Sequence, residues 1–196
     1  MRTLGAVLAG GQSRRFGSDK AEALLAGRTL LARTLDTLRP HCDAVVVVGR
    51  SATGAPDIAD WPRPGMGPLG GLAGALRHAA TEGFGQLLSL PVDCACAPAD
   101  LRARFEPAPA FAADQPVAGL WPVAALAALE AILTGDGRHS MRAFIERIGA
   151  RPVDGLDLPN INTIADLRHT EVGITDAARG TMLRPADADG RAGHGE

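Results

Sequence analysis

The first twenty residues restrict the fold of this chain more than any other stretch. Residues 3–8 form an unbroken apolar run that is typical of a buried strand. Two glycines, Gly10 and Gly11, follow at once, and backbone without side chains can approach a ligand closely. Positive charge comes next, from Arg14, Arg15 and Lys20. A strand that opens into a glycine-rich, basic turn is typical of phosphate-binding α/β proteins.

The spacing of this turn distinguishes it from the two commonest nucleotide-binding motifs. It lacks the Gly-Lys-Ser/Thr ending of the P-loop, and its adjacent glycines do not fit the Rossmann Gly-x-Gly-x-x-Gly pattern. Lys20 is the only lysine in the chain. Together with Arg14 or Arg15 it could neutralise charge that develops in phosphoryl chemistry. The alternative is a glycine-rich turn whose arginines are simply solvated.

The rest of the chain alternates between apolar strand patterns and amphipathic helix patterns. We expect further strands at residues 43–49, 84–90, 117–121 and 151–153, and helices at 29–38, 67–80, 98–105, 122–133, 140–148 and 164–171. Residues 50–68 are expected to form a loop and 107–116 a linker. This order predicts a three-layer α/β fold with a mostly parallel central sheet and helices on both faces. Residues 1–172 should form one domain, followed by a polar, flexible tail at 173–196.

Composition excludes several classes of protein. A net charge of −2 argues against a general nucleic-acid binder. The odd number of cysteines, three, predicts free thiols at Cys42, Cys94 and Cys96 rather than a disulfide framework, and their spacing does not suit zinc. We find no leader-like start and no apolar run long enough to span a membrane. The sequence therefore predicts a soluble cytoplasmic protein without a membrane partner.

A few polar residues outside the first turn are candidates for a site. Asp93 directly follows an expected strand, where open α/β sheets bind ligands, so it could hold Mg²⁺ or could be a turn or cap residue. Asn160 and Asn162, the only asparagines, alternate on one face of an extended segment or cap the next helix. Asp60 could read a base or a ribose, or be solvated. Trp121 is expected in the core.

Taken together, these residues resemble a known family. Residues 3 to about 170 are similar to the molybdenum cofactor guanylyltransferases, within the Rossmann-like nucleotidyltransferases. The matching segments are Leu8–Lys20, Gly67–Gly71, Pro91–Asp93, Gly119–Pro122 and Asn160–Thr163. The first segment is shared by nucleotidyltransferases in general, and the order and spacing of all five are those of the guanylyl branch.

The resemblance implies a reaction and a set of contacts. The terminal phosphate of molybdopterin would attack the α-phosphorus of Mg²⁺-bound GTP, releasing pyrophosphate and forming molybdopterin guanine dinucleotide. By position, the residues implied in nucleotide binding are Leu8, Ala9, Gly10, Gly11, Lys20, Gly67 and Pro68. Asp60 would contact the guanosine and Asp93 the metal. Asn160 and Asn162 would face the pterin. The resemblance also implies protein partners, which insert the cofactor into molybdoenzymes.

The chain departs from the family pattern at a few positions. Val47 replaces a common asparagine, Cys94 and Ala95 follow the metal-ligand position where a proline is usual, and Gln115 stands where histidine is common. Two alternatives therefore stay open. One is a related nucleotidyltransferase that uses CTP or another acceptor, and the other is a nucleotide-binding homologue with weakened catalysis.

Overall fold

A single mixed sheet forms the centre of the molecule. The computed structural model describes residues 1–10, 19–52, 54–161, 163, 166–167 and 170. The sheet has seven strands in the order β5-β4-β1-β6-β8-β7-β9. Their bounds are β1 Thr3–Leu8, β4 Ala44–Val48, β5 Asp57–Ile58, β6 Gln86–Pro91, β7 Ala110–Ala112, β8 Gln115–Pro122 and β9 Arg151–Val153. Strands β5, β4, β1 and β6 are parallel to one another, whereas β8 is antiparallel to β6 and to β7.

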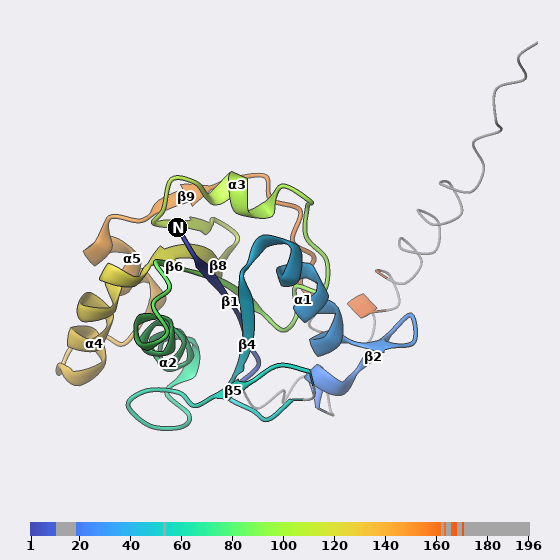
Figure 1. The fold of residues 1–196 in the computed structure, drawn as a ribbon, viewed down its shortest axis with the longest axis horizontal. Coiled ribbons are helices and arrows are strands. Elements are labelled where there is room, and N and C mark those ends of the chain that lie inside the picture. Colours follow the sequence, from blue (N-terminus) through green and yellow to red (C-terminus); the bar gives the residue numbers. More distant parts are fainter. Residues whose placement is uncertain (11–18, 53, 162, 164–165, 168–169, 171–196) are drawn as a thin grey trace, which may run out of the picture.

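Helices cover both faces of this sheet, as Figure 1 shows. The helices are α1 Leu30–Leu38, α2 Gly67–Thr81, α3 Leu101–Phe105, α4 Leu126–Thr134 and α5 Met141–Ile148, with short 3₁₀ turns at Lys20–Glu22, Arg39–His41 and Val123–Ala125. Side chains of α1 and α3 share one buried cluster with the sheet, and those of α2, α4 and α5 share the other. The predicted three-layer α/β fold with a mostly parallel sheet is therefore confirmed.

Local sequence explains why these elements form where they do. All six residues of β1 are buried, as expected for a central strand that is covered on both faces. The hydroxyl of Thr29 caps α1 by accepting a hydrogen bond from the Ala32 N–H at 3.1 Å. Ser140 caps α5 in the same way, and Gly149, with φ of 62°, ends that helix in the left-handed conformation predicted for it.

The structure also corrects several expectations. The predicted loop 50–68 contains β5, and the predicted linker 107–116 contains β7 and the first residues of β8. Strands as short as β5 and β7 carry no periodic pattern of their own, because pairing with a neighbouring strand defines them. The helix expected from residue 98 begins at Leu101, and the one expected from residue 122 begins as a 3₁₀ turn.

The expectations for Trp121 and for the three cysteines are confirmed. Trp121 is fully buried, and its indole N–H donates to the Ser89 hydroxyl at 2.8 Å. Cys42, Cys94 and Cys96 are free thiols. Within the described ranges, none of the helices has the length and hydropathy needed to cross a membrane. The predicted tail at 173–196 lies outside the described residues, as does most of the helix predicted at 164–171.

Candidate active site

The predicted site residues meet at the carboxyl ends of the parallel strands. The Ala9 N–H donates to the Val48 carbonyl oxygen at 3.0 Å, so the chain leaving β1 runs beside the end of β4. The Val92 N–H donates to the Leu8 carbonyl oxygen at 3.1 Å and holds the end of β6 on the other side of β1. The segments after β1, β4 and β6 therefore lie at one edge of the sheet, where open α/β sheets bind ligands.

Lys20 and Asp93 form an ion pair at this edge. The Lys20 Nζ lies 2.9 Å from the Asp93 Oδ2, and the two side chains are only 12% and 17% exposed. The other carboxylate oxygen, Oδ1, is buried and has no hydrogen-bond partner within the described part of the chain. The sequence analysis singled out both residues separately, and the fold brings them into contact across 73 positions of the chain.

A network of charges around Asp19 supports the turn that carries Lys20. The Asp19 carboxylate accepts a hydrogen bond from the Ala21 N–H and so caps the 3₁₀ turn Lys20–Glu22. Arg50, which follows β4, lies 2.6 Å from Asp19 and 3.1 Å from Glu22. The hydrogen bond from Arg50 lowers the pKa of the Asp19 carboxyl, so this group stays ionised and keeps both contacts. Arg50 therefore ties the Lys20 turn to the end of β4.

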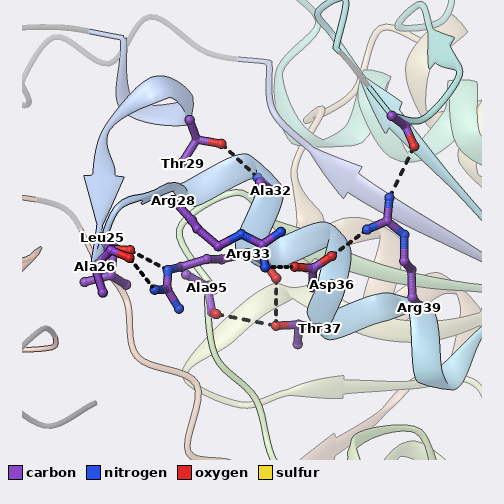
Figure 2. A network of polar contacts seen from close by, with 11 residues as sticks. Leu25, Ala26, Arg28, Thr29, Ala32, Arg33, Asp36, Thr37, Arg39 and Ala95 are labelled. Carbon is purple, nitrogen blue, oxygen red and sulfur yellow. Dashed lines mark hydrogen bonds and ion pairs between the residues drawn. The ribbon is translucent and has the colours of Figure 1, made fainter. Parts of the chain in front are cut away.

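Helix α1 holds the hairpin that follows this turn, as Figure 2 shows. Strands β2 Leu24–Leu25 and β3 Arg28–Thr29 form the hairpin. The guanidinium of Arg33 donates to the carbonyl oxygens of Leu25 and Ala26, at 2.6 and 3.3 Å. The hydroxyl of Thr34 donates to the Val92 carbonyl oxygen at 3.2 Å. One helix thus contacts both the segment after Lys20 and the segment before Asp93.

The Lys20–Asp93 pair lines a cavity of about 400 Å³, which we call the Lys20 cavity. Its walls come from the ends of β1 and β6, from the Lys20 turn, from the start of β8 and from Asn160. Among the predicted site residues it contains Leu8, Ala9, Gly10, Lys20, Pro68, Asp93 and Asn160. Its polar groups are suited to an anion held beside a carboxylate.

A second cavity adjoins the first and shares Leu8, Gly10 and Pro68 with it. This Asp60 cavity has a volume of about 410 Å³ and is lined by Leu8, Gly10, Val48, Asp60, Gly65, Gly67, Pro68 and Gly71. The Gly65 N–H donates to the Asp60 Oδ2 at 3.0 Å. The Oδ1 atom lies 3.6 Å from where a Cβ would stand at Gly71, so it faces the glycine-lined space as an acceptor.

Two close approaches of the backbone shape the Asp60 cavity. A Cβ at Gly49 would lie 2.6 Å from the Gly10 Cα, and Gly49 also has a φ of +85°, which side chains rarely tolerate. A Cβ at Gly74 would lie 2.1 Å from the Ala59 carbonyl oxygen, so only glycine lets α2 pack against the segment before Asp60. These contacts hold the end of β4 against the segment after β1, and α2 against the segment before Asp60.

Asn160 reaches the site because its neighbour is anchored in the core. Ile161 is 1% exposed and packs with Leu25, Leu30 and Ala95. Its N–H donates to the Asp93 carbonyl oxygen at 3.3 Å. Asn160 lines both the Lys20 cavity and a smaller cavity of about 100 Å³ beside it. The Asp166 N–H donates to the Thr163 hydroxyl at 3.1 Å, so Thr163 caps the turn that follows.

The residues around Asp93 fit a divalent cation that is shared with a bound phosphate. The unpartnered, buried Oδ1 is a hard oxygen ligand of the kind that Mg²⁺ prefers. Within the described ranges no cluster of three or more His, Cys, Asp or Glu side chains could hold a metal. A metal at Asp93 would therefore need most of its ligands from phosphate oxygens and water, as Mg²⁺ sites at nucleotides do.

The structure gives positions for most of the predicted residues, and the roles of all of them stay predictions. Gly11, Arg14, Arg15 and Asn162 lie outside the described residues. Sequence reasoning missed Arg50, although the rule that identified Asp93, a charged residue just after a parallel strand, applies to it equally. It also found no chemical signal at Gln115, whose side chain lines the Lys20 cavity.

Known proteins resemble the chain in sequence and in fold. Residues 5–152 match the MobA-like NTP transferase domain. A molybdenum cofactor guanylyltransferase of Acidiphilium cryptum is 42% identical over 182 residues, covering 85% of this chain and 93% of the relative. The molybdenum cofactor guanylyltransferase of Rhodobacter capsulatus is 37% identical, covering 87% of this chain and 96% of the relative.

Solved structures show the same architecture. Molybdopterin-guanine dinucleotide biosynthesis protein A of Archaeoglobus fulgidus superimposes with a TM-score of 0.71 at 25% identity, covering 88% of this chain and 99% of that one. The 2-C-methyl-D-erythritol 4-phosphate cytidylyltransferase of Thermus thermophilus gives a TM-score of 0.61 at 18% identity, covering 89% and 98%. The second similarity shows a shared fold alone.

Proposed function

The chain belongs to the MobA-like NTP transferase family, and we propose that it transfers GMP from GTP to molybdopterin, releasing pyrophosphate. An oxygen of the molybdopterin phosphate forms a new bond to the α-phosphorus of GTP, and the bond from that phosphorus to the bridging oxygen breaks. The observation that carries the proposal is the Lys20–Asp93 pair in a cavity that adjoins the Asp60 cavity.

The chemistry asks for positioning and charge neutralisation rather than for a strong base. The attacking phosphate is already an anion, so no proton has to be removed from it. Lys20 supplies a cation with little exposure, and electrostatic stabilisation is strongest where water is excluded. In this mechanism Lys20 neutralises the charge that grows on the pyrophosphate as it leaves.

Asp93 is the residue that would hold Mg²⁺. The metal would supply further neutralisation of phosphate charge. Until a nucleotide is present, Lys20 keeps the carboxylate oriented through Oδ2 while Oδ1 stays without a partner. The pair thus holds both side chains in place before the substrates arrive.

The Asp60 cavity is the place where we expect the guanosine. Guanine presents two N–H donor groups on its Watson–Crick edge, and the Oδ1 of Asp60 is an acceptor that faces this space. A carboxylate that accepts from such donors forms charge-assisted hydrogen bonds, which are stronger than neutral ones. Cytosine presents fewer N–H donor groups on this edge than guanine, so Asp60 favours GTP over CTP.

Nucleotide-dependent stability tests this function. We expect GTP with Mg²⁺ to raise the melting temperature more than CTP, ATP or UTP, since a ligand that binds only the folded state stabilises it. Chromatography should show that GTP and molybdopterin yield the dinucleotide and pyrophosphate. Stabilisation by CTP but not by GTP would contradict the proposal, and no response to any nucleotide would favour a catalytically weakened homologue.

The cellular setting follows from the substrates. Because GTP is an intracellular nucleotide, we place the reaction in the cytoplasm. We expect the product to pass to proteins that insert the cofactor into molybdoenzymes. Co-purification of such a protein with this chain, with the dinucleotide bound, would test this transfer.

A further inference from the structure

The side chain of Gln115 carries a donor that the proposed chemistry has not used. Gln115 is the first residue of β8 and lines the Lys20 cavity together with Lys20 and Asp93. Its amide nitrogen, Nε2, is buried and has no hydrogen-bond partner among the residues that the structure describes. A buried donor without an acceptor destabilises the folded protein, so its presence at a cavity suggests an acceptor that arrives with a ligand.

Cys94 determines which end of this amide accepts a hydrogen bond from the protein. The Sγ of Cys94 lies 2.6 Å from the Oε1 of Gln115, so the thiol donates to the amide oxygen. Cys94 is fully buried, so this contact with the amide is shielded from solvent. Rotating the amide by half a turn would set its N–H groups against this donor.

The position of Gln115 assigns it to the second substrate, molybdopterin, rather than to the nucleoside. It lines the Lys20 cavity and the smaller cavity beside Asn160, but not the Asp60 cavity. The attacking phosphate must reach the phosphorus held near Lys20, so it has to enter the cavity that Gln115 lines. An amide donor can orient a phosphate without the strong charge neutralisation that would weaken it as a nucleophile.

We propose that Gln115 binds the phosphate of molybdopterin through its side-chain N–H group, and that Cys94 is a positioning residue that orients the amide. This inference rests on the proposed function, because that function supplies the phosphorylated acceptor. It adds an acceptor-binding residue to the site and gives Cys94 a role that depends on its hydrogen atom rather than on its reactivity.

Steady-state kinetics with both substrates test the role of Gln115. In Gln115→Met, which keeps the length of the side chain but removes the donor, we expect the KM for molybdopterin to rise about tenfold, the effect of losing a hydrogen bond to a charged group. The KM for GTP should stay unchanged. Gln115→His restores an N–H donor and should recover most of the affinity for molybdopterin.

Gln86→Met is the matched control. Gln86 begins β6 and pairs with Pro122, the last residue of β8, so it lies at the opposite edge of the sheet from Gln115. Its amide oxygen is also buried without a partner. The same substitution there should leave both KM values unchanged, which separates loss of a ligand contact from loss of a buried amide.

Cys94 provides a second, independent pair of variants. Cys94→Ser keeps a donor and should retain the wild-type KM for molybdopterin, whereas Cys94→Ala removes it and should raise this KM alone. Equal values for the two variants would overturn the positioning role. Thermal melting of each variant checks that the fold is intact.

The outcomes separate this inference from the proposed function. If Gln115→Met matches the wild type in its KM for molybdopterin, or changes the KM for GTP instead, the assignment of Gln115 is wrong and the function stands. If the wild-type chain does not use GTP, direct titration with molybdopterin still applies. A weaker affinity in Gln115→Met would then support Gln115 while the guanylyl assignment falls.

Discussion

The two adjoining cavities are lined by different kinds of residue. The Asp60 cavity is lined mainly by glycine, proline and aliphatic residues around one carboxylate. The Lys20 cavity combines a cation, two carboxylates and two amides with apolar residues. Shape therefore dominates one side of the site and charge the other. Substitutions in the first cavity should act on GTP binding, whereas substitutions of the charged residues in the second cavity should act on the chemical step.

The largest effect is expected where the charge is concentrated. Lys20→Met keeps the aliphatic stem but removes the ammonium, and we expect kcat to fall about 10³-fold, as when an electrostatic group in an oxyanion site is lost. Single-turnover kinetics at saturating substrates would measure this. Arg28→Met is a suitable control, since Arg28 is a solvent-exposed cation that pairs with Asp36 outside both cavities. A change in KM alone would break the contrast between the cavities.

Asp93→Asn should have the next largest effect. The amide keeps the size of the side chain but is a poorer ligand for Mg²⁺, and we expect kcat to fall about 100-fold at ordinary Mg²⁺ concentrations. A Mg²⁺ titration should show that higher concentrations restore part of the activity. Activity that is lost equally at every Mg²⁺ concentration would argue that Asp93 acts only by holding Lys20.

Asp60→Asn tests the charged group of the shape-dominated cavity. We expect the KM for GTP to rise about tenfold with little change in kcat, because a charge-assisted hydrogen bond is replaced by a neutral one. ITP, which lacks the exocyclic amino group of guanine, should lose less affinity than GTP on this substitution. An equal loss of affinity for the two nucleotides would indicate that Asp60 contacts the ribose rather than the base.

The smallest effect is expected at Gly71, on the helix that walls the Asp60 cavity. A Cβ there would meet Leu8 and Val48 at ordinary contact distances of 3.5 Å, so Gly71→Ala should fold. The higher helix propensity of alanine should raise the free energy of unfolding by about 0.5–1 kcal/mol. The added methyl group should raise the KM for GTP about threefold, since it occupies space in the cavity.

Gly74→Ala provides the contrast for that measurement. Gly74 lies on the same helix, but a Cβ there would overlap the Ala59 carbonyl oxygen, so this variant should melt at a lower temperature. If Gly71→Ala were the less stable of the two variants, the account of how α2 packs would be wrong.

Much of this site could be predicted from the sequence because the carboxyl ends of parallel strands lie at the same edge of a sheet. The apolar runs at 3–8, 43–49 and 84–90 predicted three strands, and the structure shows that these strands are neighbours in the sheet, so the residues that follow them share one edge. That rule put Asp93 at the same edge as the turn that carries Lys20. The same reasoning could not give the ion pair itself, because its distance depends on how the 3₁₀ turn and the hairpin pack against α1.

Other parts of the site carried no usable signal. Gln115 reaches the site only because β8 runs antiparallel to β6, a direction that its residue pattern does not reveal. Its hydrogen bond with Cys94 joins two residues that no pattern in the sequence connects. For Asp60 the residues alone left a solvated carboxylate open, and only the family resemblance indicated a guanosine contact. The structure now places this side chain at a cavity.

The hydrogen bond from Ile161 to Asp93 has a consequence for the order in which the site is completed during synthesis. Every residue that lines the Asp60 cavity lies between positions 8 and 71, so all of them emerge from the ribosome early. The Lys20 cavity also needs Gln115 and Asn160, and the anchor at Ile161 comes later still. The cavity proposed for the nucleoside is thus encoded first, and the cavity proposed for the molybdopterin phosphate is completed last.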